Sequence, residues 1–255
     1  MPYWLMALLA TLGTWAVTAL GAAVVLFFRN PKERTLRVML GFAAGVMLAA
    51  SVWSLLEPAM AQATQLLHMP GWPLAVSGCL CGVVFLWAAD RLIAHFKPDG
   101  SARSARMLVF SITLHNIPEG LAVGVAFGML AVNPTRETFL SACSVAVGIA
   151  VQNFPEGAAV SLPLQKAGFS RKRSFFWGQL SGVVEPIAGV FGALMAMVAT
   201  YSLPFLLSFA AGAMLLVSLH ELIPACHTAG EEERSYLPTA GMLLGFLLMM
   251  VLENL

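Results

Sequence analysis

Charged residues are scarce in this chain. Asp, Glu, Lys and Arg together make up 11% of its 255 residues, whereas they make up about 25% of an average soluble domain. Hydrophobic residues account for 59%, so a soluble protein of this composition would have too little polar surface to stay in solution. The composition therefore predicts a polytopic membrane protein. The formal net charge of +1 gives no indication of a nucleic-acid partner.

Cysteine is scarce as well. The four cysteines, Cys79, Cys81, Cys143 and Cys226, all lie inside or at the edge of apolar stretches. The single residue between Cys79 and Cys81 fits neither a zinc-site spacing nor a disulfide framework. We interpret all four as buried, reduced thiols.

Apolar stretches long enough to cross a lipid bilayer, which takes about 20 residues, recur along the whole chain. No basic residue precedes the first stretch and Arg29 follows it, so we expect a retained helix rather than a cleaved signal. The pattern predicts an all-α bundle in the lipid bilayer, with residues 1–255 forming a single transmembrane domain. Its eight helices are expected at about 4–28, 36–58, 73–95, 106–130, 138–164, 174–198, 203–226 and 237–254.

Basic residues are confined to alternate connections. Of the 14 Lys and Arg residues, all but Arg136 lie in or beside the connections that follow the first, third, fifth and seventh stretches. Lys and Arg concentrate on the cytoplasmic side of membrane proteins. The alternation therefore supports eight spans and predicts that both termini lie outside the cell membrane, which we expect to be a bacterial inner membrane.

Two hexapeptides within the apolar stretches resemble one another. Residues 115–120 read HNIPEG and residues 152–157 read QNFPEG. In each, a side chain able to bind a metal stands four residues before a Glu, so both lie on one helix face. The proline between them frees a backbone carbonyl one turn earlier. At membrane depth such a carbonyl needs polar surroundings, so we expect a polar, partly hydrated interior here.

The two hexapeptides are predicted to lie at the same depth. With a rise of about 1.5 Å per residue, His115, Gln152, Glu185 and Met47 all approach the bilayer centre. The fourth and fifth helices run in opposite directions, which is typical of an inverted pair with a site at the midplane. Pro186 is expected to disturb the sixth helix at this level.

The charge at this depth is unbalanced. Glu119, Glu156 and Glu185 are accompanied by no Lys or Arg, and three unpaired charges would cost roughly 8–10 kcal/mol. Protons or divalent cations could supply the missing positive charge. The remaining candidate ligands suit zinc or a neighbouring transition metal better than calcium or magnesium; they are His115, Asn116, Gln152, Asn153 and Met47.

These residues resemble the ZIP (Zrt/Irt-like) family of divalent-metal transporters, in its prokaryotic branch. The resemblance rests on both hexapeptides, on Glu185-Pro186 and on residues 220–224, which read HELIP. It implies eight helices with outward termini, a homodimer, and zinc uptake through a two-metal centre between the fourth, fifth and sixth helices.

The resemblance also implies a ligand set for each metal ion. The first ion would be held by His115, Glu119, Gln152 and Glu156, with Met47 nearby. The second would be held by Asn116, Glu119, Asn153, Glu156 and Glu185, so that Glu119 and Glu156 bridge. Many relatives have His where this chain has Gln152, a weaker neutral ligand, so iron, manganese or cadmium remain alternative substrates.

Three further residues could form an exit route for the metal. His220 and Glu221 lie in the cytoplasmic half of the seventh helix, and His227 follows one heptad later. Alternatively, His220 and Glu221 satisfy backbone groups opened by Pro224. A zinc protease would need a second His at that position, so we expect no enzyme and no cofactor, the metal being the cargo. A metal-selective channel remains an alternative, because the same ligands could line a pore.

Overall fold

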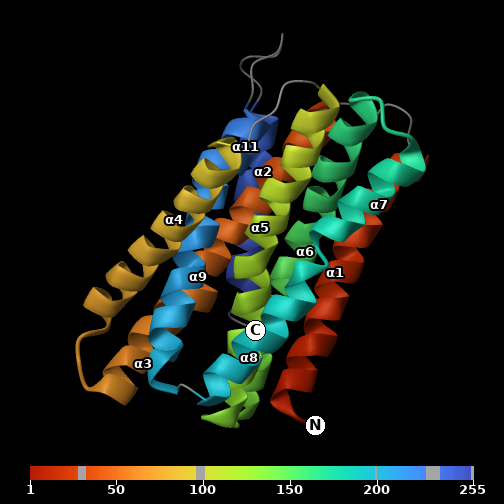
Figure 1. The fold of residues 1–255 in the computed structure, drawn as a ribbon. Helices are drawn as coiled ribbons and strands as arrows, with labels where there is room; N and C mark the ends of the chain where they lie inside the picture. Colours follow the sequence, from red (N-terminus) through yellow and green to blue (C-terminus); the bar gives the residue numbers. More distant parts are fainter. Residues whose placement is uncertain (28–32, 96–100, 199, 228–235, 254–255) are drawn as a thin grey trace.

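Helices make up every regular element in the described part of the chain (Figure 1). The computed structural model describes residues 1–27, 33–95, 101–198, 200–227 and 236–253, without the side chains of residues 93–95, 101–108, 110, 111, 115, 197, 198 and 200. The elements are α1 (Tyr3–Phe27), α2 (Glu33–Ala50), η1 (Ser51–Leu56), α3 (Glu57–Leu67), α4 (Gly71–His95), α5 (Ser101–Gly128), η2 (Met129–Ala131), α6 (Arg136–Lys166), α7 (Arg171–Ser181), α8 (Val184–Val198), η3 (Thr200–Ser202), α9 (Leu203–Val217), η4 (Ser218–Leu222), α10 (Ile223–Cys226) and α11 (Leu237–Leu252).

The protein is a multi-pass membrane protein. By length and composition, six helical segments of the described chain can cross a membrane: Tyr3–Phe27, Glu33–Leu67, Gly71–Leu92, Arg136–Lys166, Arg171–Ala196 and Leu203–Cys226. The other two predicted spans correspond to α5, with 28 residues, and α11, with 16 residues. At about 1.5 Å per residue α11 is about 24 Å long, which is shorter than a typical hydrocarbon core.

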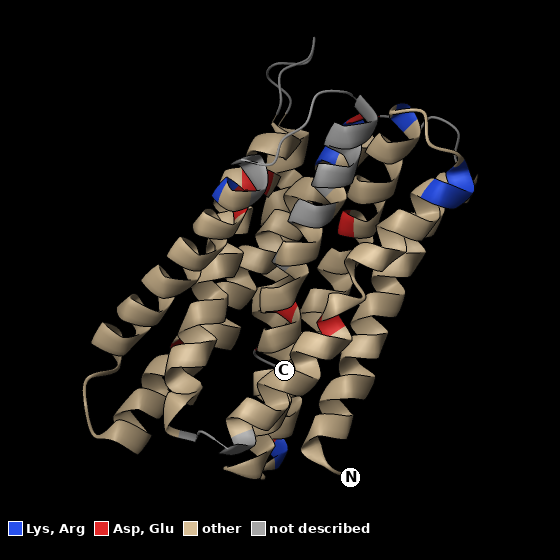
Figure 2. Cartoon of the chain, in the orientation of Figure 1, with Lys and Arg blue, Asp and Glu red and all other residues tan. Residues whose placement is uncertain are grey.

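Charge is distributed unevenly along the bundle. Figure 2 shows Lys and Arg gathered at one end, with little blue at the other, and Asp and Glu also placed midway between the ends. At the basic end, the Lys166 ammonium lies 2.6 Å from the Glu33 carboxylate, which links α6 to α2.

Two predicted helices differ from the observed ones. The predicted end near residue 58 is wrong, because α2, η1 and α3 form one helical segment that continues to Leu67. Pro58 stands in the first turn of α3, where a proline is tolerated. The sixth predicted helix is interrupted between Ser181 and Val184, so the expected disturbance next to Pro186 is confirmed.

Glycines bring the helices together in close pairs. A Cβ added at Gly45 of α2 would lie 1.9 Å from the Met242 carbonyl oxygen of α11. In the same way, a Cβ at Gly212 of α9 would lie 2.1 Å from the Cys79 carbonyl oxygen of α4. Small residues permit such approach where lipid supplies no hydrophobic driving force between helices. The α2–α11 and α4–α9 pairs therefore pack backbone against backbone.

The helices α2 and α9 share a seven-residue sequence that is nearly identical, and they run in opposite directions (Figure 1). Residues 42–48 read FAAGVML and residues 209–215 read FAAGAML. A serine follows each, Ser51 and Ser218, and donates a hydrogen bond to the methionine carbonyl one turn earlier, over 2.8 and 2.9 Å. A π-helical segment begins at each serine. This repeat is not among the features predicted from the sequence above.

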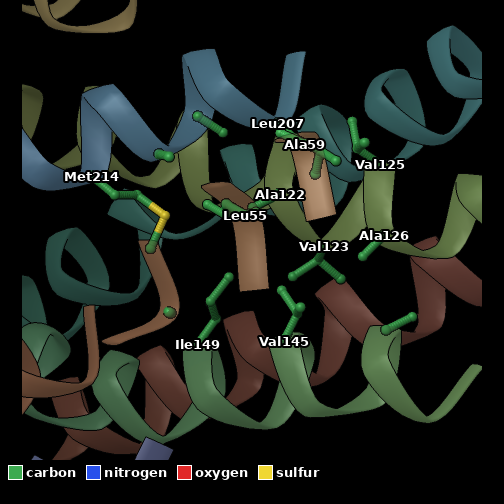
Figure 3. Close-up of a cluster of buried hydrophobic side chains, with 14 of the residues drawn as sticks. Leu55, Ala59, Ala122, Val123, Val125, Ala126, Val145, Ile149, Leu207 and Met214 are labelled. Atoms are coloured by element: carbon green, nitrogen blue, oxygen red, sulfur yellow. The ribbon is translucent and has the colours of Figure 1, made fainter. Parts of the chain in front are cut away.

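The apolar core fills the space between η1, α3, α5, α6 and α9. Figure 3 shows Leu55, Val123, Val145 and Ile149 converging from η1, α5 and α6. All four are at most 1% exposed. We call the buried side chains labelled there the apolar plug. They are Leu55, Ala59, Ala122, Val123, Val125, Ala126, Val145, Ile149, Leu207 and Met214.

Replacing Gly212 with Ala should destabilise the protein, because the new methyl group would meet the Cys79 backbone of α4 rather than a movable side chain. Overpacking of this kind costs about 1–3 kcal/mol, so thermal unfolding in detergent should occur at a lower temperature. Gly13→Ala is the matched control, since nothing lies within 4 Å of a Cβ at Gly13, and it should be neutral or slightly stabilising. Equal unfolding temperatures for the two variants would contradict this account of the helix pairs.

Candidate metal centre

Helix α5 supplies the first pair of candidate ligands. Asn116 and Glu119 are 1% and 0% exposed and lie about one turn apart. Pro118 between them stays inside the uninterrupted helix. A Cβ added at Gly120 would lie 2.5 Å from the Glu185 carbonyl oxygen, so this glycine allows α8 to pack closely beside Glu119. The side chain of His115 lies outside the described part of the structure.

Helix α6 supplies the second group of candidate ligands. Gln152 and Asn153 are fully buried and Glu156 is 7% exposed. The Gln152 side-chain Nε2 donates a hydrogen bond of 2.9 Å to Glu119 Oε1. The two repeated hexapeptides are therefore in direct contact, as their predicted depths indicated.

The break between α7 and α8 brings Glu185 into the same group. Glu185 lies in the first turn of α8 and is fully buried. Asn153 Nδ2 donates to Glu185 Oε2 over 2.8 Å, and Asn116 Nδ2 donates to the Ser181 carbonyl at the end of α7 over 3.0 Å. Side chains from α5, α6 and α8 thus meet at one place in the bundle.

The first helix also reaches this site, which our sequence analysis did not predict. Thr14 Oγ1 donates to Glu185 Oε2 over 2.5 Å, and Thr18 Oγ1 lies 3.2 Å from Glu185 Oε1. Both threonines are 1% exposed. The available signal was the spacing of Thr11, Thr14 and Thr18, which places three hydroxyls on one face of an otherwise apolar helix.

Four buried oxygen atoms at the site lack a hydrogen-bond donor in the described structure. They are Asn116 Oδ1, Glu119 Oε2, Gln152 Oε1 and Asn153 Oδ1. A buried acceptor without a partner costs about 1–3 kcal/mol, and native proteins rarely contain several together. All four belong to predicted metal-ligating residues. Amide and carboxylate oxygens can each donate an electron pair to a metal cation. The unpaired atoms therefore fit a cation-binding site.

The carboxylates make the site strongly negative. Glu119 experiences electrostatic repulsion from Glu156 and Glu185, and Glu156 experiences it from Glu221 as well. Within the described part of the chain, no Lys or Arg forms an ion pair with Glu119, Glu156 or Glu185. Such a cluster in a membrane interior is stabilised by a bound cation.

The other predicted residues differ in their burial. Met47 is fully buried and packs in the apolar core. His220 is exposed, Glu221 is half-buried, and the exposed His227 has Nε2 at 3.1 Å from Thr239 Oγ1. Among the described side chains, no three of the His, Cys, Asp and Glu type lie together as a complete metal site.

Comparisons with known proteins identify the family of this chain. The family model described as "ZIP Zinc transporter" matches residues 1–106 and 99–253. The human protein "Zinc transporter ZIP11" is 37% identical, over 97% of this chain and 96% of its own length. "Zinc transporter GufA" from Myxococcus xanthus is 38% identical, over 96% of this chain and 97% of its own. "Zinc transporter ZIPB" from Bordetella bronchiseptica is 36% identical, over 94% of this chain and 78% of its own.

The similarity covers nearly the whole chain, including the helices that carry both hexapeptides and Glu185. It confirms the predicted resemblance, and it confirms that the protein is a transporter rather than an enzyme, since the relatives are named as transporters. The chain belongs to the ZIP zinc transporter family.

Proposed function

We propose that this protein carries zinc into the cytoplasm across the cell membrane. The observation that carries the proposal is the set of four buried, unpaired oxygen atoms among three carboxylates that form no ion pair with a described Lys or Arg. A cation that loses its water would find replacement ligands there. The relatives named as zinc transporters support zinc as the cation.

The proposed centre holds two metal ions between α5, α6 and α8. One would be bound by His115, Glu119, Gln152 and Glu156, with Met47 of α2 nearby. The second would be bound by Asn116, Asn153 and Glu185, with Glu119 and Glu156 bridging the two ions. The Gln152–Glu119 hydrogen bond supports this assignment, because it already brings one ligand from each hexapeptide together.

The proposed orientation follows from the charges. We assign the basic end of the bundle in Figure 2 to the cytoplasm, which would place eight spans in the membrane and both termini outside. A homodimer is part of the same proposal.

Apolar side chains pack on both sides of the site. The apolar plug residues of α5 follow Glu119 and those of α6 precede Gln152, whereas Val109, Val160 and Leu164 form a smaller cluster on the other side. On the side of the apolar plug, Glu253 accepts hydrogen bonds from Ser54 and Ser144, over 2.6 and 3.0 Å, which ties α11, η1 and α6 together. On the proposed cytoplasmic side, His220 and His227 are exposed and would receive departing metal together with Glu221.

A broader metal specificity is a second candidate. Gln152, Asn116 and Asn153 offer neutral amide oxygens, which are weaker and less zinc-selective ligands than imidazole or thiolate. Iron, manganese and cadmium therefore stand as alternative substrates of the same site.

Replacing both Glu119 and Glu156 with Ala should abolish zinc uptake into liposomes, because both proposed bridging ligands would be lost. Uptake should fall to the level of empty liposomes, measured with a zinc-sensitive dye inside the vesicles. Glu137→Ala is the matched control, since Glu137 is an exposed residue in the first turn of the same helix as Glu156, and it should retain uptake. Unchanged transport by the double variant would mean that the site is wrongly placed.

Uptake of zinc, cadmium, iron and manganese by the reconstituted protein should show a preference for zinc and saturate with concentration. Saturation is expected because a carrier changes conformation once per transported load, whereas an open pore conducts in proportion to the gradient. Uptake that rises linearly to millimolar zinc would favour the channel alternative. Equal rates for the four metals would favour the broader specificity.

A further inference from the structure

The first helix places three hydroxyl groups along its buried face. Thr11, Thr14 and Thr18 are each at most 1% exposed, and α1 runs beside both α6 and α8 (Figure 1). In an apolar helix a threonine hydroxyl commonly bonds to the carbonyl of the preceding turn. Thr11 does so, with its hydroxyl donating to the Ala7 carbonyl over 2.7 Å. Thr14 and Thr18 also lie 3.0 and 3.3 Å from such carbonyls, but in addition they reach across to another helix.

Thr14 and Thr18 approach different oxygen atoms of one carboxylate. Thr14 Oγ1 lies 2.5 Å from Glu185 Oε2, closer than the 3.0 Å to the Thr11 carbonyl in its own helix. A hydroxyl has a single proton, and short O–H···O contacts of this kind are typical of donation to a carboxylate. Thr18 Oγ1 lies 3.2 Å from Glu185 Oε1. The two hydroxyls therefore hold the carboxylate from the α1 side.

These contacts leave the two Glu185 oxygens unequal. Oε2 accepts from both Thr14 and Asn153, which uses the two lone pairs of a carboxylate oxygen. Oε1 has Thr18 as its only hydrogen-bond donor in the described structure and so retains a lone pair. A cation that approaches Glu185 is offered one oxygen rather than two.

The backbone around Glu185 is also fixed on α1. Trp15 Nε1 donates to the Gln179 carbonyl of α7 over 2.9 Å, just before the helix break. A Cβ added at Gly182, inside the break, would lie 3.0 Å from Trp15 Cδ1 and 3.2 Å from Thr18 Cβ. The break that presents Glu185 therefore packs directly against α1 and has little freedom to move away from the two hydroxyls.

We propose that Thr14 and Thr18 are positioning residues that hold Glu185 as a one-oxygen metal ligand and thereby favour zinc over larger cations. Zinc takes few ligands, at about 2.0–2.2 Å from carboxylate oxygens. Calcium takes 6–8 oxygens and often uses both oxygens of one carboxylate. A carboxylate with one oxygen already occupied disfavours the second mode. The inference rests on the proposed metal site, to which it adds two residues of α1.

The test compares zinc and calcium binding by the full-length protein in lipid nanodiscs, measured by calorimetry. Thr14→Val with Thr18→Val keeps the side-chain shape and removes both hydroxyls. We expect zinc affinity to fall at least about tenfold, as is usual when partners of a metal ligand are lost, while calcium affinity stays or rises. Thr14→Ser with Thr18→Ser restores the hydroxyls and should restore the zinc-to-calcium ratio.

Thr11→Val is the matched control, because the Thr11 hydroxyl bonds within its own helix, and it should bind zinc as the unaltered protein does. Each single valine variant is also measured, with an expected loss of about threefold, so that the test stands if the double variant does not fold. An unchanged zinc-to-calcium ratio in the valine variants, or a Thr11→Val loss as large as theirs, overturns the inference while the proposed function stands. Absence of zinc binding by the unaltered protein overturns both.

Discussion

The whole arrangement depends on three buried carboxylates that are paired with no Lys or Arg among the described side chains. Glu119 and Glu185 are fully buried and Glu156 nearly so, in a protein whose Lys and Arg residues gather at one end of the bundle (Figure 2). Amide and hydroxyl groups stabilise part of this charge by hydrogen bonding, as Gln152 does for Glu119. They cannot neutralise it, because neutral donors add no positive charge. A cation bound for part of the time resolves this imbalance, and a transporter needs binding of this temporary kind.

The bundle combines regular, closely packed helix pairs with a few irregular segments. Close pairs such as α2–α11 and α4–α9, in which glycines bring the backbones into contact, form the regular part of the bundle. Among the described segments, irregular backbone includes the break before Glu185 and the two π-helical segments. Irregular backbone at membrane depth is tolerated where protein surrounds it. The α7–α8 break meets this condition, because α1 covers it with Trp15 and Thr18.

Much of the site could be predicted from local sequence. The two hexapeptides carry ligand, proline and Glu at fixed spacing, so helix geometry alone places each pair on one face. Glu185 could be added by counting residues from the helix ends. Thr14 and Thr18 could not, because threonine in an apolar helix usually bonds to its own backbone, and only the packing of α1 on α8 reveals another acceptor.

Two other features of the fold were not predicted from the sequence, for different reasons. Pro58 suggested a helix end, yet the π-helical segment before it lets the helix continue to Leu67. The FAAG repeat in α2 and α9 is visible in the sequence, but its copies are far apart and separated by the helices that carry the two hexapeptides.

That repeat has a mechanical consequence. The matching stretches of α2 and α9 run in opposite directions. Each is followed by a π-helical segment that begins at the corresponding serine, Ser51 or Ser218. Both stretches contribute side chains to one apolar core, among them Met47 and Met214. We expect that an exchange of packing partners between the two stretches would require little net free energy, because equivalent side chains would replace one another.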